Sequence, residues 1–134
     1  MASFLRKEKP ASNPLVLVPD YSNTIELTSL YVASNATNGA LTRYYVAPSH
    51  GHFHWFRSIS VETYKITFYI LIGESQVAKP VAFVNVGNDG GHASTVILPM
   101  AKGDRLRIDT NHARDAFASD KVKMIFVPDK LAEF

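Results

Sequence analysis

The chain has 134 residues, of which 46% are hydrophobic and 19% charged, and its formal net charge is +2. This composition is typical of a globular protein, and the length predicts one domain with a core of its own. The small net charge, with cations scattered among nearly as many carboxylates, argues against a nucleic-acid partner. The absence of cysteine excludes disulfides, a thiol nucleophile and thiolate metal ligands. No apolar run reaches the ~18 residues of a membrane helix, so we expect no membrane partner.

The first 19 residues show no hydrophobic periodicity and predict an extended arm. Charged residues at 6–9 precede Pro10, Pro14 and Pro19, and proline favours an extended backbone. We therefore divide the chain into an arm, residues 1–19, and a domain, residues 20–134. Such an arm can add backbone hydrogen bonds to the sheet edge of a neighbour, or it can pack on its own domain.

From residue 15 onward the chain is a series of short segments with period-two alternation. Because alternate side chains of a strand point to opposite faces, these segments predict strands. In residues 64–72, for example, Ile66 and Phe68 share one face and Lys65 and Thr67 the other. Only residues 111–119 and the tail from Asp129 are candidates for a helical turn or two. The expected strands cover residues 15–18, 24–33, 41–47, 52–58, 64–72, 81–86, 94–98, 105–109 and 121–127.

About nine short strands at this spacing predict an all-β sandwich or barrel. Residues 94–108 comprise a strand, a turn at residues 102–104 and a second alternating strand. This stretch resembles the late hairpin of jelly-roll heads of the complement and tumour-necrosis-factor-like type. Residues 44–56, with Ala47, Pro48 and Gly51 between two strands, are similar to a hairpin common in β-rich structural domains of phage particles. The resemblance implies a jelly-roll-like antiparallel β-sandwich that assembles as a homotrimer.

Jelly-roll heads of this type usually follow a stalk, whereas this chain begins with a proline-containing arm. That combination resembles a bacteriophage decoration or cement protein. It implies a non-enzymatic protein of the virion that binds the major capsid protein or other virion proteins, and that needs no cofactor. The alternatives are a receptor- or carbohydrate-binding head of a phage tail or fibre, and a cupin-like metalloenzyme.

Partner contacts are expected from the arm and from exposed aromatic residues. Six tyrosines and one tryptophan exceed what one small core needs if their polar groups are unsatisfied. Several of these rings should therefore lie at the surface or between subunits, where they could also stack on sugars beside Asn35, Asn38, Asn88 and Asp89. The residues expected to bind a partner are Phe4, Leu5, Arg6, Lys7, Lys9, Tyr44 and Trp55.

Histidines stand at alternate positions 50, 52 and 54. On a strand His52 and His54 point to the same face, so together they could chelate one metal ion. Alternatively, this face packs against another surface while Phe53 and Trp55 fill the core. No carboxylate stands at an obvious position to support the imidazoles. The pattern also resembles the His-x-His of cupins, although Glu62 lies too far along the chain for the cupin spacing.

Overall fold

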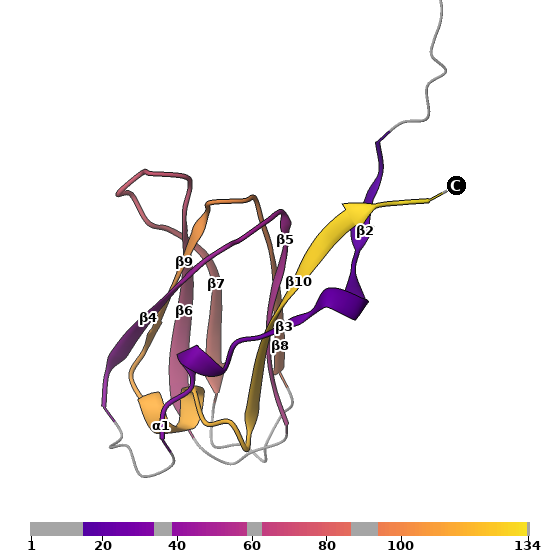
Figure 1. Cartoon of the computed structure of the whole chain (residues 1–134). Helices are drawn as coiled ribbons and strands as arrows, with labels where there is room; N and C mark the ends of the chain where they lie inside the picture. The colour runs from indigo at the N-terminus through magenta and orange to yellow at the C-terminus, as the bar shows by residue number, and fades with distance from the viewer. Residues whose placement is uncertain (1–14, 34–38, 59–62, 87–93, 134) are drawn as a thin grey trace, which may run out of the picture.

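In the computed structural model, two antiparallel β-sheets pack face to face (Figure 1). The structure describes residues 15–33, 39–58, 63–86 and 94–133. Within these ranges, three single turns accompany the strands: η2 (Tyr21–Asn23), η3 (Thr28–Leu30) and α1 (Ala113–Ala116). The strands are β2 (Leu17–Pro19), β3 (Ile25–Glu26), β4 (Leu41–Val46), β5 (Gly51–Arg57), β6 (Tyr64–Leu71), β7 (Lys79–Val86), β8 (Ser94–Met100), β9 (Arg105–Thr110) and β10 (Val122–Leu131).

The strand order confirms the predicted jelly-roll-like sandwich. One sheet has the order β2-β10-β5-β8, with β3 also paired to β10, and the other has the order β4-β9-β6-β7. From β3 onward, consecutive strands alternate between the sheets, except that β6 and β7 form a hairpin. Two interleaved four-strand paths of this kind define the jelly-roll connectivity.

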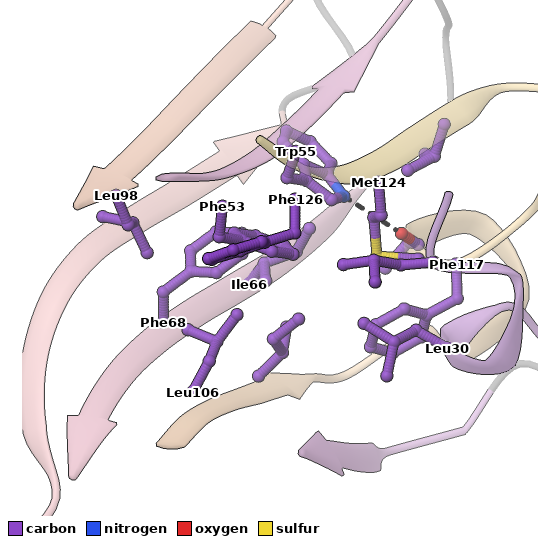
Figure 2. Close-up of a cluster of buried hydrophobic side chains, with 14 of the residues drawn as sticks. Leu30, Phe53, Trp55, Ile66, Phe68, Leu98, Leu106, Phe117, Met124 and Phe126 are labelled. Carbon is purple, nitrogen blue, oxygen red and sulfur yellow. Dashed lines mark hydrogen bonds between the residues drawn. The ribbon is translucent and has the colours of Figure 1, made fainter. Parts of the chain in front are cut away.

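The core is filled by the inward-facing residues of both sheets (Figure 2). Phe53 and Trp55 of β5 and Phe68 of β6 are fully buried. The ring centroid of Phe68 lies 6.0 Å from that of Phe53 and 6.1 Å from that of Trp55, a normal separation for interacting rings. The alternation of β5 therefore places Phe53 and Trp55 inside, which is one of the two arrangements expected from the sequence, and turns His52, His54 and Phe56 outward.

Both stretches expected to be hairpins are instead corners between the two sheets. β8 and β9 lie in different sheets, and so do β4 and β5. The corners lie side by side, because the Ala47 N–H donates to the Asp104 carbonyl oxygen and the Gly103 N–H donates to the Ala47 carbonyl oxygen, both at 2.9 Å. Turn residues give the position of a reversal but not the layer that the next strand joins, so the sequence prediction of a hairpin was wrong.

Asp104 and Gly103 provide the chemistry of the β8–β9 corner. Gly103 has a φ of 88°, in the left-handed region that favours glycine. The Asp104 carboxylate accepts hydrogen bonds from the N–H groups of Ala101, at 3.0 Å, and Gly73, at 3.3 Å. This carboxylate thus satisfies two backbone donors of different loops and holds them together.

The strand predicted over residues 24–33 is wrong. Only Ile25–Glu26 pair with β10, and the η3 turn follows. Leu27 and Leu30 are buried, and their spacing of three matches the three-residue period of a 3₁₀ turn. Because these two leucines carry the burial, the segment turns rather than extends.

β10 continues to Leu131, four residues beyond the expected end, so the tail from Asp129, a candidate for a helical turn, begins as a strand instead. Its last residues pair with β2, in the register Leu17 with Leu131 and Pro19 with Asp129. The end of the predicted arm is thus a strand of the domain's own sheet. The arm residues Phe4, Leu5, Arg6, Lys7 and Lys9 lie outside the described residues. Within the described ranges, no helix is long and apolar enough to cross a membrane.

Candidate functional site

β2 and the end of β10 form a two-stranded ribbon that extends away from the two sheets, toward the upper right in Figure 1. We call residues 15–19 and 129–132 the ribbon. The Ala132 N–H donates to the Val16 carbonyl oxygen at 2.8 Å and continues the pairing past Leu131. The pairing of β10 with β5 ends at Pro128, so among the described strands only β2 pairs with residues 129–131.

The ribbon exposes large apolar side chains. Leu15 is 84% exposed, Leu17 52% and Leu131 56%. A two-stranded ribbon alone is at best marginally stable in water, and clustered exposed apolar side chains are typical of interaction surfaces. The ribbon therefore has the properties of an element that another surface covers.

A groove lies at the foot of the ribbon, on the outer face of the β2-β10-β5-β8 sheet. Its first part, of about 280 Å³, lies among Leu17, Pro99 and Asp129. Its second part, of about 130 Å³, lies among Tyr21, Ile97 and Val127. His52 lines both parts, so we treat them as one groove.

His52 and His54 share the floor of the groove, as the alternation of β5 predicts. In the strand register, His52 lies between Val127 and Pro99, and His54 lies between Ile125 and Ile97. Burial among these apolar neighbours disfavours the charged imidazolium and, together with the nearby His52, lowers the pKa of His54.

One carboxylate does approach these histidines, contrary to the sequence analysis. Asp129 Oδ1 lies 3.4 Å from His52 Nδ1. The last strand was predicted to end at residue 127, and only the continuation of β10 past Pro128 brings Asp129 beside β5. His50 is engaged elsewhere, because its Nδ1 accepts a hydrogen bond from the Lys102 N–H at 3.3 Å.

Metal binding by His52 and His54 stays a prediction. In the described ranges, no group of three or more histidine, cysteine or acidic side chains is arranged to hold a metal ion. Glu62, considered for the cupin pattern, and the loop residues Asn35, Asn38, Asn88 and Asp89 lie outside the described residues.

Trp55 is wrong as a partner contact. Its side chain is 0% exposed, and its Nε1 donates to the Ala116 carbonyl oxygen at 3.3 Å, the dashed line in Figure 2. A buried indole N–H needs an acceptor, and the α1 turn provides one inside the core. Tyr44, in contrast, is 57% exposed on the outer face of the other sheet, and its role as a partner contact stays a prediction.

A polar and aromatic row crosses that second sheet. Arg107 of β9 is paired in register with Tyr44 of β4 and with Tyr69 of β6, and its Cζ lies 4.7 Å from the Tyr69 ring centroid. The guanidinium makes two hydrogen bonds to Asp109, at 2.7 and 3.0 Å, and Thr42 Oγ1 donates to Asp109 Oδ1 at 2.8 Å.

The hydrogen bonds from Arg107 are the main cause of a lowered pKa for Asp109. The tyrosines were predicted from the sequence to lie at the surface, whereas the pairing of Arg107 with Asp109 was not predicted. Their alternation with buried Leu106 and Ile108 was the available signal, because it places both charged residues on one outer face.

Comparison with known sequences identified no relative of this protein. No protein-family model matches the chain. The curated proteins likewise contain no match to it. A functional proposal therefore rests on the fold and on the two surfaces described above.

Proposed function

We propose that the protein is a non-enzymatic structural protein that binds other protein subunits, with the exposed ribbon as its principal contact. The setting we propose is a phage particle, where the protein decorates the capsid as a homo-oligomer. The jelly-roll-like connectivity supports that setting. The observation that carries the proposal is the apolar, two-stranded ribbon that extends beyond the sandwich.

The free energy of covering the apolar side chains of the ribbon favours their burial against a partner over their exposure to water. Leu15, Leu17 and Leu131 together leave about two leucine side chains of apolar surface in solvent. Covering that surface would contribute roughly 3–5 kcal/mol. A capsid lattice presents many copies of one site, so an oligomer that engages several sites gains further affinity by avidity.

The direct test is cosedimentation with particles of the virus that encodes the chain. We expect the native protein to travel with the particles in a density gradient. The Leu17→Asp variant should stay at the top, because a carboxylate on the ribbon would have to be desolvated. Val81→Asp is the matched control, since Val81 is 47% exposed on β7 of the other sheet. Native protein that never travels with particles would refute the proposal.

A carbohydrate-binding head is the second candidate, and the Tyr44–Arg107 row favours it. The exposed ring of Tyr44 offers a flat apolar face, and the guanidinium held by Asp109 offers fixed donors beside it. Stacking on a ring combined with fixed polar groups is a chemistry that suits a sugar.

Glycan binding separates the two candidates. On a glycan array, the second candidate requires binding by the native protein and its loss in Tyr44→Ala. Tyr21→Ala is the matched control, because Tyr21 is 68% exposed in the η2 turn, beside the opposite sheet, and its loss should leave glycan binding unchanged. If native protein binds no glycan on the array, the second candidate is rejected and the decoration proposal is unaffected.

A further inference from the structure

We propose that residues 1–14 of one copy of the chain bind in the groove of a second copy, between Tyr21 and Ile97, and so link copies head to tail. This inference rests on the proposed function, because it identifies what covers one of the binding surfaces. Its ligand is a second copy of this protein, and its site is the groove floored by His52 and His54.

The position of Leu15 is the first argument. β2 runs antiparallel to β10, with Leu17 opposite Leu131 at the outer end of the ribbon and Pro19 opposite Asp129 at the inner end. The chain therefore enters the described structure at the end of the ribbon farthest from the sandwich (Figure 1). Fourteen residues precede that point, and in an extended chain they reach about 45 Å.

The direction of entry favours a second copy over the same copy. To reach its own groove, the segment would have to reverse direction at Leu15 and run back along the ribbon. A neighbouring groove can be reached without a reversal.

The chemistry of the groove matches this segment. Tyr21, Ile97 and Pro99 present exposed apolar surface, and Val127 closes the floor with 1% exposure. Phe4 and Leu5 are adjacent large apolar residues that can fill such a groove. Aromatic and aliphatic anchors in desolvated pockets carry most of the affinity in interfaces of this kind.

Charge complementarity supports the same occupant. Arg6, Lys7 and Lys9 give the segment three cations against the single acid Glu8. The foot of the groove carries Asp129, whose Oδ1 lies 3.4 Å from His52 Nδ1, and beside it Asp20, whose Oδ1 lies 3.9 Å from Lys130 Nζ. Asn23 and Ser22 donate hydrogen bonds to the Asp20 carboxylate at 2.7 and 2.8 Å and lower its pKa, which favours the charged form. Complementary charge of this kind sets orientation and partner choice.

A head-to-tail contact uses two different surfaces of each copy. Such contacts close into rings when the rotation between copies permits it, and the trimer implied by the resemblance would be one such ring. The two surfaces can therefore be removed separately, one in each of two variants.

The experiment measures mass in solution for two variants and their mixture. Deleting residues 1–14 removes the occupant and leaves the groove intact. Ile97→Asp keeps residues 1–14 and introduces a charge into the groove. We expect the native chain to be oligomeric at micromolar concentration and each variant alone to be monomeric. An equimolar mixture should give a heterodimer, because residues 1–14 of the Ile97→Asp chain bind in the groove of the shortened chain.

Val81→Asp is the control, because Val81 has nearly the same exposure as Ile97, 47% against 51%, and lies on the other sheet. This variant should keep the native mass. The thermal midpoint of each variant establishes that it is folded. A native chain that is monomeric, variants that remain oligomeric, or a mixture without heterodimer would each overturn the inference. An arm bound to its own groove would appear as a native monomer whose oligomeric state is unchanged by the deletion.

The failure of this inference can be told apart from failure of the proposed function. If native protein is monomeric but sediments with particles, and the Leu17→Asp variant does not, then binding of residues 1–14 in the groove is rejected and the decoration role is retained. If the mixture gives a heterodimer but native protein does not bind particles, then binding of residues 1–14 in the groove is retained and the decoration role is rejected.

Discussion

The corner before β5 is closed so tightly that Gly51 has no room for a side chain. A Cβ added there would contact the carbonyl oxygen of Val127 and would lie 2.7 and 2.8 Å from two ring carbons of Phe126. Real Cβ contacts essentially never fall below 3.0 Å, so β5 or β10 would have to move. Phe126 and Val127 are buried at 0% and 1% exposure, which leaves them little space to yield.

Gly51→Ala should therefore be destabilising by overpacking. Inserting a methyl group into a packed site costs typically 1–3 kcal/mol, and contact with backbone places this site at about 3 kcal/mol. The entropy of unfolding of a chain of this size is roughly 0.3 kcal/mol per K, so the thermal midpoint should fall by about 10 °C.

Thermal unfolding followed by circular dichroism measures this effect. Gly39→Ala is the matched control, because a Cβ there has no atom within 4 Å. That variant should stay within about 1 kcal/mol of the native protein, with a small gain from the stiffer unfolded chain. Equal midpoints for the two variants would refute the packing described for β5 against β10. Gly51→Ala should also weaken oligomerisation, since β5 carries the floor of the groove.

Three further predictions concern the corner and the titratable groups. Asp104→Ala should cost about 1–2 kcal/mol in urea unfolding, because it removes the acceptor of two backbone N–H groups, whereas exposed Asp120→Ala should be nearly neutral. Because the pKa of Asp109 is lowered in the folded protein, this carboxylate stabilises the fold at pH values above its ordinary pKa of 3.8. That stabilisation is lost as the pH falls through the pKa of the folded protein. Asp109→Asn should therefore be less stable than native protein at pH 7 and nearly equal to it at low pH; a gap that does not close on acidification contradicts this. The lowered pKa of His54 acts in the same direction at higher pH: the unfolded chain takes up a proton first as the pH falls below 6.5, so stability is lost there. His54→Leu should remove that part of the loss between pH 7.5 and 5, with His52 and Asp129 present in both proteins, and an unchanged pH dependence would contradict the assignment.

The sheets were predictable because alternation was strong where strands are buried on one face. Phe53 with Trp55, and Ile66 with Phe68, are separated by one outward residue in each strand, and this spacing alone gives strands with one buried face. The alternation also placed His52 and His54 together on the outer face. The strand predicted over residues 24–33 was wrong because the buried residues of that segment, Leu27 and Leu30, are spaced by three rather than two.

Long-range features were not predictable from local pattern. Which sheet a strand joins depends on packing of the whole core, so the corners at residues 47–50 and 101–104 were mistaken for hairpins. Pro128 suggested the end of a strand, since proline cannot donate to a ladder, yet it only ends the pairing with β5. The ribbon and the proximity of Asp129 to His52 both follow from that continuation. Trp55 was assigned to an interface because its acceptor, the Ala116 carbonyl, is 61 residues away in the chain.

Amide hydrogen exchange on the ribbon tests the central claim most directly, because it reports whether the ribbon is covered whichever subunit covers it. Its amides include those of Leu17, Val18, Lys130 and Leu131. We predict that these amides exchange at least roughly tenfold more slowly in the assembled native protein than in the two variants expected to be monomeric, the deletion of residues 1–14 and Ile97→Asp. The amides of β6 should be equally protected in all three proteins. Ribbon amides that exchange equally fast in the assembly and in the monomer would contradict the claim that this protein works by binding through its ribbon.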